Sequence, residues 1–374
     1  MKVAIIVFSP NGNTFKVSKM LEKCLLNRNI LVQIINITRK NIFDDNRRIV
    51  NYLKENVQKH DLLCIGSPVY AHHLHYNIKN LIKFLPKPDN IWSKLVIPFI
   101  TYGGLNSGIA LYEAAKSLKK SERIIISGMK IDSFHCWTKR FSEKINEGLP
   151  GDEALVYIND LVDRIINFDY TNYSNNIDIT KELNYQNLKV RIKAKLIFRE
   201  KFSHSYVYPK LVIDRDKCTQ CGKCTKICPV QRLELKLRFK LTQQSLENLR
   251  KEGISEEILR SLNSLEDQQF TIKKEFVVAV KEKIGTEQTA RNKKLILENA
   301  QIKENDFLIE KSNIGCIHCQ MCSFSCSSDA IYFDTDWSKW EKIITKSGKG
   351  LGPLPSNEYP KSAVYPIYKK EEGI

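Results

Sequence analysis

Apolar residues in the first 170 positions gather in five short runs with few polar interruptions. The runs are Lys2–Phe8, Ile30–Ile37, Leu62–Gly66, Leu95–Ile100 and Ile124–Ile126. Strands buried on both faces of a parallel sheet have this pattern. Segments with helical spacing separate or follow them, namely Phe15–Leu26, Arg47–Gln58, Tyr76–Leu85, Ser107–Lys119 and Asp152–Phe168. The alternation predicts a doubly wound α/β domain of five parallel strands over residues 1–168.

The pattern changes after residue 168. Residues 169–210 open with a polar stretch rich in Asn, Asp and Tyr, which predicts a linker. Alternating basic and apolar residues within 182–202 then predict a basic amphipathic helix. Such a helix can bind a membrane surface or RNA. More commonly it packs its apolar stripe on a neighbouring domain and exposes its charge to water.

A second domain is predicted at residues 211–336, bracketed by the strand-like runs Leu211–Ile213 and Ala330–Phe333. Its middle, about 235–305, reads as a charged amphipathic helical insert. The insert is either a docking surface for a partner or a tolerated helical hairpin. The Gly- and Pro-rich residues 337–374 predict an irregular C-terminal tail.

Eight of the eleven cysteines form two runs of identical spacing within the second domain. The first run is Cys218, Cys221, Cys224 and Cys228, and the second run is Cys316, Cys319, Cys322 and Cys326. Soft thiolates at this spacing suit iron–sulfur clusters, and the spacing is that of bacterial [4Fe–4S] ferredoxins. In those proteins the fourth cysteine of each run ligates the other cluster.

The ferredoxin pattern therefore implies two [4Fe–4S] clusters with exchanged fourth ligands. Cluster I takes Cys218, Cys221, Cys224 and Cys326, and cluster II takes Cys316, Cys319, Cys322 and Cys228. Zinc sites typically use two separate Cys-x2-Cys pairs, so one tight run of four fits zinc poorly. Disulfides need an oxidising compartment, and the start of the chain reads as a strand rather than a secretory leader. We therefore expect an intracellular, cytoplasmic protein.

The second cysteine run departs from the ferredoxin pattern beside its last ligand. Ser327 replaces the proline that follows the first run as Pro229, and Ser323 and Ser325 add hydroxyl groups. Hydrogen bonds to cluster sulfur tune the potential. We therefore expect two clusters of unequal potential.

Charge and composition narrow the possible partners. The chain has 59 basic and 42 acidic residues, a net charge of +17 spread over both halves. A basic surface favours acidic partners such as acidic ferredoxin-type donors, or aids solubility. No recognised RNA-binding pattern accompanies the charge, so we expect no nucleic-acid partner. No run reaches the roughly 18 apolar residues of a membrane span.

Three loops follow strands of the first domain at the edge where such sheets bind ligands. Their residues are Ser9, Asn11, Gly12, Asn13 and Thr14, then Ser67, Pro68, Val69 and Tyr70, then Thr101, Tyr102, Gly103 and Gly104. Free backbone N–H groups at a helix N-terminus make the first loop a phosphate site. Together the three loops resemble the flavodoxin family. The resemblance implies a flavodoxin-like sheet of order 2-1-3-4-5, an FMN phosphate held by the first loop, and a flavin ring flanked by the other two.

Two residues depart from the usual flavodoxin phosphate loop. Pro10 removes one N–H donor, and Asn11 replaces the usual hydroxyl residue. The nearby His72, His73 and His75 can ligate a metal, hydrogen-bond the flavin or supply a proton to it, although loop histidines are usually only solvated. Cys136, beside Trp137, is placed in a loop that can lie near the flavin.

A flavodoxin-like half joined to a two-cluster ferredoxin half resembles the fused flavodoxin/ferredoxin family. The resemblance implies electron transport between two [4Fe–4S] clusters and FMN, with no catalytic acid, base or nucleophile. An oxidoreductase that passes these electrons to a small-molecule acceptor at the FMN face is the alternative, and a scaffold without FMN is a third reading. No second nucleotide-binding motif is present, so direct NAD(P)H oxidation is not expected.

Overall fold

A computed structural model describes residues 1–40, 42–43, 45–171, 178–196, 206–237, 243–263, 269–270, 307–311, 315–345 and 360–366. The chain divides into two compact units. Unit 1 contains 1–209, 317–320 and 335–374, and unit 2 contains 210–316 and 321–334. Among the described residues, no helix is both long and apolar enough to cross a bilayer.

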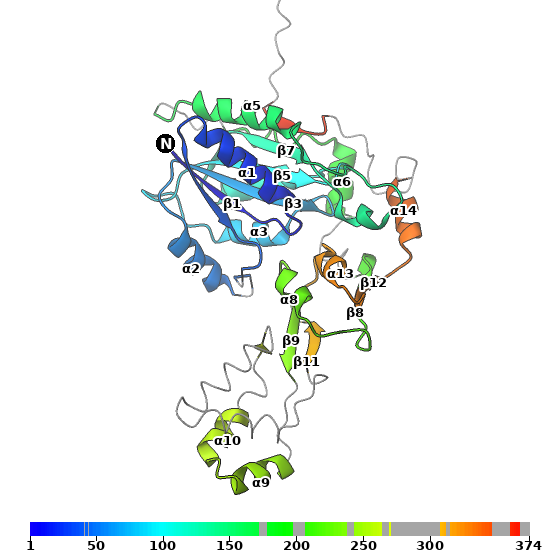
Figure 1. Ribbon diagram of the computed structural model, residues 1–374. Coiled ribbons are helices and arrows are strands. Elements are labelled where there is room, and N and C mark those ends of the chain that lie inside the picture. Colours follow the sequence, from blue (N-terminus) through cyan, green and yellow to red (C-terminus); the bar gives the residue numbers. More distant parts are fainter. Residues whose placement is uncertain are drawn as a thin grey trace, which may run out of the picture. The chain divides into compact units, whose positions relative to one another are not determined.

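Unit 1 is built on a parallel sheet (Figure 1). Its strands are β1 (Lys2–Val7), β2 (Leu31–Asn36), β3 (Leu62–Tyr70), β5 (Leu95–Tyr102), β6 (Ile124–Ile125) and β7 (Gly128–Asp132). The order β2-β1-β3-β5-β7 is the predicted 2-1-3-4-5 order, counted over the five long parallel strands. The fifth predicted run, Ile124–Ile126, forms only the short β6, and the long fifth strand is β7, which lies just beyond that run and also pairs with β5.

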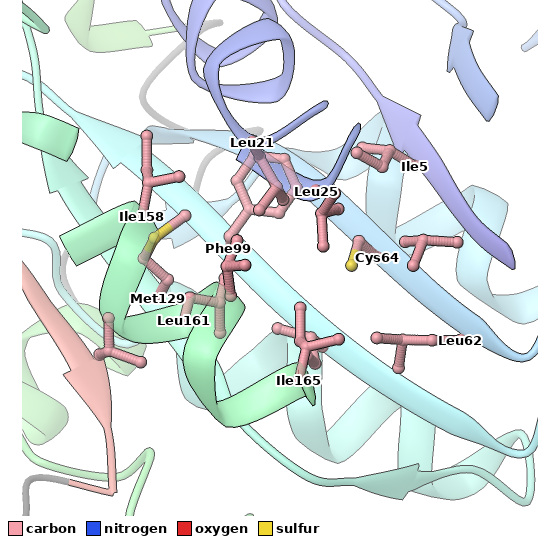
Figure 2. Packing of buried hydrophobic residues seen from close by; sticks show 14 of the residues in the cluster. Ile5, Leu21, Leu25, Leu62, Cys64, Phe99, Met129, Ile158, Leu161 and Ile165 are labelled. Atoms are coloured by element: carbon pink, nitrogen blue, oxygen red, sulfur yellow. The ribbon is translucent and has the colours of Figure 1, made fainter. Parts of the chain in front are cut away.

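Helices cover both faces of this sheet. They are α1 (Asn13–Leu26), α2 (Asn46–Asn56), α3 (Tyr76–Lys83), α4 (Ala110–Lys120) and α5 (Ala154–Ile166). In Figure 1, α1 and α5 lie on one face and α3 lies on the other. The apolar stripe of each helix meets the sheet, as Figure 2 shows for Leu21 and Leu25 of α1 and Ile158 of α5 around Phe99. Burying each such side chain contributes about 1.5–3 kcal/mol.

Two segments of unit 1 differ from the sequence expectation. The residues Ser67–Tyr70, expected as a loop, continue β3 and turn back as β4 (His73–Leu74). Past Gly66, β3 no longer pairs with β1, so the missing N–H of Pro68 removes no hydrogen bond to that neighbour. The tail from 337, expected to be irregular, contains helix α14 (Trp337–Thr345) and strand β13 (Ala363–Tyr365).

Strand β13 pairs antiparallel with β7 at the edge of the main sheet. Side chains secure it, because Ser362 Oγ lies 2.6 Å from Asp132 Oδ1 and Ser127 Oγ donates to the Tyr365 carbonyl at 2.8 Å. Tyr365 also stacks on Tyr185 with ring centroids 4.8 Å apart. The C-terminal strand therefore covers an edge that β7 would otherwise expose.

The predicted basic helix is present as α6 (Leu188–Leu196) in unit 1. It buries Val190 and Ala194 and leaves Leu188, Ile192 and Leu196 exposed. The rest of that prediction, residues 197–202, lies outside the described residues.

Unit 2 consists of two similar strand–cysteine run–helix–strand halves. The first half is β8 (Lys210–Ile213), α8 (Lys223–Ile227) and β9 (Leu233–Leu237), and the second is β11 (Phe307–Lys311), α13 (Met321–Ser325) and β12 (Ile331–Asp334). Strand β8 pairs with β12 and β9 pairs with β11, both antiparallel. One sheet contains β8 and β12, and the other contains β9 and β11, so each half supplies one strand to each sheet. This is the pairing expected of two halves related by a pseudo-two-fold axis.

The inserted segment between the halves contains helices and a short strand. These are α9 (Gln243–Lys251), α10 (Glu256–Asn263) and β10 (Gln269–Phe270), the last paired with β9. The expected apolar helix positions near 276–280 lie outside the described residues.

Candidate flavin and iron–sulfur sites

The first loop forms a fixed turn at the N-terminus of α1. Ser9 anchors it, because its backbone N–H donates to Thr38 Oγ1 at 2.8 Å and its Oγ accepts the Phe15 N–H at 2.9 Å. Gly12 precedes the helix with φ of 88°, and its N–H donates to the Ser9 carbonyl at 3.2 Å. A left-handed backbone at this position favours glycine.

This loop offers hydrogen-bond donors that the protein does not use. Within the described residues, the backbone N–H groups of Asn11, Asn13 and Thr14 donate to no protein atom. The unused N–H groups lie at the positive end of the 14-residue helix α1. The donor set therefore fits a phosphate, despite the N–H that Pro10 lacks.

Side-chain contacts and strand register join the three predicted loops at one sheet edge. The Thr14 and Thr101 hydroxyl oxygens lie 2.7 Å apart, both buried, which joins the first loop to the end of β5. Pro68 of β3 is the register partner of Thr101. The structure thus brings Ser9–Thr14, Ser67–Tyr70 and Thr101–Gly104 together, although Ser67–Tyr70 and Thr101–Tyr102 are the last residues of strands β3 and β5 and not loops.

A fourth segment, after β7, also reaches this edge. Of its residues, only Cys136 was expected near the flavin. Asn13 Nδ2 donates to the Phe134 carbonyl at 3.1 Å. The His135 ring lies so close to Gly103 that a Cβ there would be 2.4 Å from its Cδ2. Residues 133–150 have no periodic apolar pattern, so no sequence signal marked His135.

Two histidines at this edge are neutral at physiological pH. Burial lowers the pKa of His135 to about 4, and burial also lowers that of His72 to about 4, with His73 and His135 adding to the effect on His72. Among the described residues, the buried Nδ1 of His135 has no hydrogen-bond partner. It is therefore a polar atom left for a ligand beside Gly103.

The other predicted histidines serve the fold. His73 lies 2.9 Å from both Glu113 Oε1 and the Ala194 carbonyl, which ties β4 to α4 and α6. His75 Nδ1 accepts the Asn77 N–H at 3.1 Å and so begins α3. Among the described residues, no three His, Cys, Asp or Glu side chains converge closely enough to hold a single metal ion.

The two predicted ring tyrosines differ in their surroundings. Tyr70 is half-buried and meets the His75 ring edge-on at 5.0 Å, so part of it remains accessible. Tyr102 is buried, and its hydroxyl donates to the Lys361 carbonyl at 2.7 Å. The Tyr102 side chain is therefore engaged with the C-terminal segment, and only its backbone stays at the loop edge.

The thiol of Cys136 lies beside the first loop. Cys136 opens the 3-10 helix Cys136–Arg140, and burial raises its pKa to about 11 although a hydrogen bond with Asn11 opposes the shift. A thiol that stays protonated is a poor nucleophile. Cys136 is thus a contact of the loop and not a reactive group.

Four cysteines of unit 2, Cys218, Cys221, Cys224 and Cys326, lie near one another. Burial raises the pKa of Cys224 to about 12, and the nearby Cys218, Cys221 and Cys326 raise it further. These four are the predicted ligands of cluster I. Thiols kept protonated by burial release their protons when iron binds, so the set fits a buried metal centre.

Three members of the second predicted set, Cys316, Cys322 and Cys228, also lie near one another within unit 2. Burial raises the pKa of Cys322, and Cys316, Cys228 and Cys224 add to the shift. Cys316, Cys228 and Cys322 itself belong to the predicted cluster II. The fourth member, Cys319, is buried in the segment Ile317–Gln320, which is part of unit 1.

The last cysteines of the two runs have different hydrogen bonds. Cys228 Sγ accepts the Arg232 N–H at 3.1 Å. Burial alone would raise the pKa of Cys326, but the Ser328 hydroxyl, with Sγ···Oγ of 3.5 Å, and nearby backbone N–H groups lower it. Ser325, which we expected near the sulfurs, instead donates to the Cys322 carbonyl at 3.0 Å.

The segment Ile317–Gln320 is held by an aromatic cluster of unit 1, which consists of Trp137, Tyr208, Trp337 and Trp340. Trp137 Nε1 donates to the His318 carbonyl at 3.0 Å, and its ring meets Trp340 edge-on at 5.1 Å. His318 Nε2 lies 3.1 Å from the Pro209 carbonyl. Trp137 directly follows the first-loop contact Cys136, so one short segment contacts both the predicted phosphate loop and the second cysteine run.

Family comparisons match two separate parts of the chain. Residues 1–128 match the NADPH-dependent FMN reductase family, and residues 210–233, around the first cysteine run, match a 4Fe-4S binding domain. No curated protein matches the chain.

Solved structures resemble the N-terminal part. An archaeal flavodoxin is 16% identical, covering 50% of this chain and 100% of its own, with a TM-score of 0.29. An NADH:FMN oxidoreductase in its apo form is 19% identical, covering 44% and 89%, with a TM-score of 0.34. A flavodoxin from Pseudomonas aeruginosa is 13% identical, covering 44% and 99%, with a TM-score of 0.31.

The fold and the two family matches agree on the composition of the chain. Its N-terminal sheet has the flavodoxin-like order, and its cysteine-rich unit contains a 4Fe-4S domain match. The matches support FMN and at least one iron–sulfur cluster as cofactors. The chain therefore joins a flavodoxin-like domain to a ferredoxin-type domain and is an FMN and iron–sulfur redox protein.

Proposed function

We propose that the protein transfers electrons within one chain between two [4Fe–4S] clusters and FMN. When bound, FMN exchanges one or two electrons and each cluster exchanges one. The observation that carries the proposal is the Trp137 hydrogen bond to His318, since His318 lies between the cysteines Cys316 and Cys319.

The residues of the chain bind and orient the cofactors in this proposal. The N–H groups of Asn11, Asn13 and Thr14 hold the phosphate, and the loop ends at Ser67–Tyr70 and Thr101–Gly104 flank the ring. The neutral His135 offers its Nδ1 beside Gly103. The eight cysteines hold two clusters with exchanged fourth ligands. The proximity of Cys326 to Cys224 and of Cys228 to Cys322 supports the exchange.

The experiment begins with anaerobic reconstitution of the full chain with iron, sulfide and FMN. The proposal expects about eight iron atoms and one FMN per chain. A potentiometric titration followed by EPR and absorbance should resolve two cluster signals and one flavin. A chain that binds one cluster, or no FMN, would contradict the proposal.

A second candidate function is a reductase that delivers the electrons to a small molecule at the flavin face. The His135 Nδ1 favours it, because within the described residues this buried atom has no protein partner and is left for a substrate at the loop edge. The matched FMN reductase family also suggests this chemistry. Steady-state turnover of quinones or nitroaromatics with reduced ferredoxin or NADPH would separate a reductase from a carrier.

A further inference from the structure

Four basic residues lie within or just before the first cysteine run of unit 2. Arg215, Lys217, Lys223 and Lys226 are exposed, and so is Cys221 among them. We name these four basic residues the basic collar. Lys217 pairs with Asp214 at 3.3 Å, whereas the other three make no ion pair within the described residues.

The pseudo-two-fold repeat of unit 2 provides an internal comparison for this charge. When Cys218 is aligned with Cys316, the positions of the basic collar correspond to the uncharged residues Asn313, Gly315, Met321 and Phe324. From 214 to 226 the chain has four basic and two acidic residues, whereas 312–324 has neither kind. The second half of unit 2, with β11, α13 and β12, has the same order of elements without these charges. The strand–helix–strand arrangement therefore does not require them.

The two runs also differ in exposure. Cys221 is exposed, whereas its counterpart Cys319 is 7% exposed and lies in the segment held by Trp137. An electron carrier must approach its partner at an exposed edge, because transfer between proteins needs close contact. The exposed cysteine is thus the one that the basic collar flanks along the chain.

We propose that the basic collar docks an acidic one-electron carrier protein, which exchanges electrons with the cluster held by Cys218, Cys221, Cys224 and Cys326. This inference rests on the proposed function. The reduced carrier loses one electron and the cluster gains one, with no bond made and no proton moved. Opposite charges steer such an encounter and raise its rate.

Other anionic partners fit the basic collar less well. From 214 to 226 the sequence holds no aromatic residue on which a nucleic-acid base could stack. The same stretch contributes no exposed large apolar side chain that could enter a membrane interface. A folded acidic protein surface needs neither feature.

The test uses a charge-reversal pair in the reconstituted full chain, Lys223→Glu with Lys226→Glu. The control pair is Lys116→Glu with Lys120→Glu on α4, two exposed lysines that give the same change in net charge. The probe is a reduced acidic two-cluster ferredoxin, mixed in stopped flow at ionic strengths of about 0.01 M and about 1 M, where the Debye length is about 30 Å and about 3 Å. Photoreduced deazariboflavin is the small reductant that needs no docking surface, and iron content verifies that both variants hold their clusters.

The proposal expects the collar pair to lower the bimolecular rate constant about tenfold at low ionic strength. At about 1 M the difference from wild type should vanish. The control pair and the deazariboflavin rates should match wild type. Equal slowing by both pairs, no slowing by the collar pair, or a wild type that the ferredoxin does not reduce would each overturn the proposal.

Failure of the proposed function has a separate signature. If deazariboflavin reduces the clusters while the flavin stays oxidised, the internal transfer is wrong whatever the ferredoxin rates are. If vesicles rich in phosphatidylserine bind wild type and not the collar variant, with unchanged ferredoxin rates, the collar serves a membrane and the docking proposal is wrong.

Discussion

The indole Nε1 of Trp137 donates a hydrogen bond to the backbone carbonyl of His318, 181 residues later in the chain, at 3.0 Å. Trp137 is buried, and its ring also meets Tyr208 edge-on at 4.8 Å. This bond holds the segment that contains Cys319 beside the segment that contacts the predicted phosphate loop.

Trp137→Phe keeps an aromatic ring and removes the donor. Losing one hydrogen bond costs about 1 kcal/mol, which lowers the population of the bonded segment by up to about fivefold. We expect the rate of electron exchange between clusters and flavin to fall by up to that factor, with cofactor content unchanged. Flash reduction followed at cluster and flavin wavelengths measures the rate.

The control for this variant lies in the same aromatic cluster. Trp340 Nε1 donates to Thr335 Oγ1 at 2.9 Å, so Trp340→Phe also loses an indole hydrogen bond but leaves His318 untouched. Equal slowing in both variants would show that the Trp137 bond has no special role.

Asn11→Asp tests the phosphate site. The substitution adds a negative charge next to the unused N–H groups at the start of α1, so we expect FMN affinity to fall at least about tenfold, or about 1.4 kcal/mol. Riboflavin, which lacks the phosphate, should lose much less. Fluorescence titration of the flavin-free protein measures both.

Asn27→Asp at the other end of α1 is the matched control, since it makes the same charge change on an exposed residue. It should leave FMN affinity unaltered. Equal weakening of FMN and riboflavin by Asn11→Asp would place the phosphate elsewhere.

Exchanged ligation predicts which cysteine variants behave alike. Cys326→Ser should remove the same EPR signal as Cys218→Ser, and Cys228→Ser the same signal as Cys316→Ser, because each pair shares a cluster. Each variant should lose about four iron atoms. Cys24→Ser, a half-buried cysteine of α1, should lose none. If Cys326→Ser instead matched Cys316→Ser, each run would hold its own cluster.

The buried histidines predict a stability loss in mild acid. The pKa values of His72 and His135 are lowered by burial from 6.5 to about 4, so the folded state binds fewer protons than the unfolded state between these pH values. The free energy of unfolding should therefore fall as the pH drops from about 6.5 to about 4.

Denaturant titrations of the flavin-free protein at several pH values measure this slope. His72→Gln with His135→Gln should flatten it in part, and His60, whose pKa burial also lowers, should maintain the remainder. An unchanged slope in the double variant would mean that these histidines are accessible to protons in the folded protein.

The sequence predicted the elements that repeat a strong local pattern. Four of the five long parallel strands lie on the predicted apolar runs, whereas β7 lies just beyond the run Ile124–Ile126. The cysteine spacing is readable without knowledge of the surrounding fold. The sequence did not predict that β3 would extend through Pro68, because that depends on β1 ending at Val7 beside it. It missed β13 because a three-residue strand forms only where β7 offers an open edge.

The sequence indicated the three segments Ser9–Thr14, Ser67–Tyr70 and Thr101–Gly104 of the candidate site. It indicated almost nothing of the segment that follows β7. His135 reaches Gly103 only because the chain after β7 folds back over the sheet edge, with the Phe134 N–H donating to the Leu149 carbonyl at 3.0 Å. Tyr102 was expected to contact the flavin ring, but its side chain is bonded to Lys361, which lies 259 residues later in the chain. Such contacts leave no local pattern in a single sequence.

The most direct test of electron transfer within one chain is the time course of its two chromophores after a brief pulse of photoreduced deazariboflavin. We predict that the clusters bleach first and recover as the flavin becomes reduced, with a rate constant that does not change with protein concentration. A flavin that stays oxidised while the clusters remain reduced would contradict the account. So would a flavin reduction rate that rises in proportion to protein concentration, because the electrons would then pass between molecules.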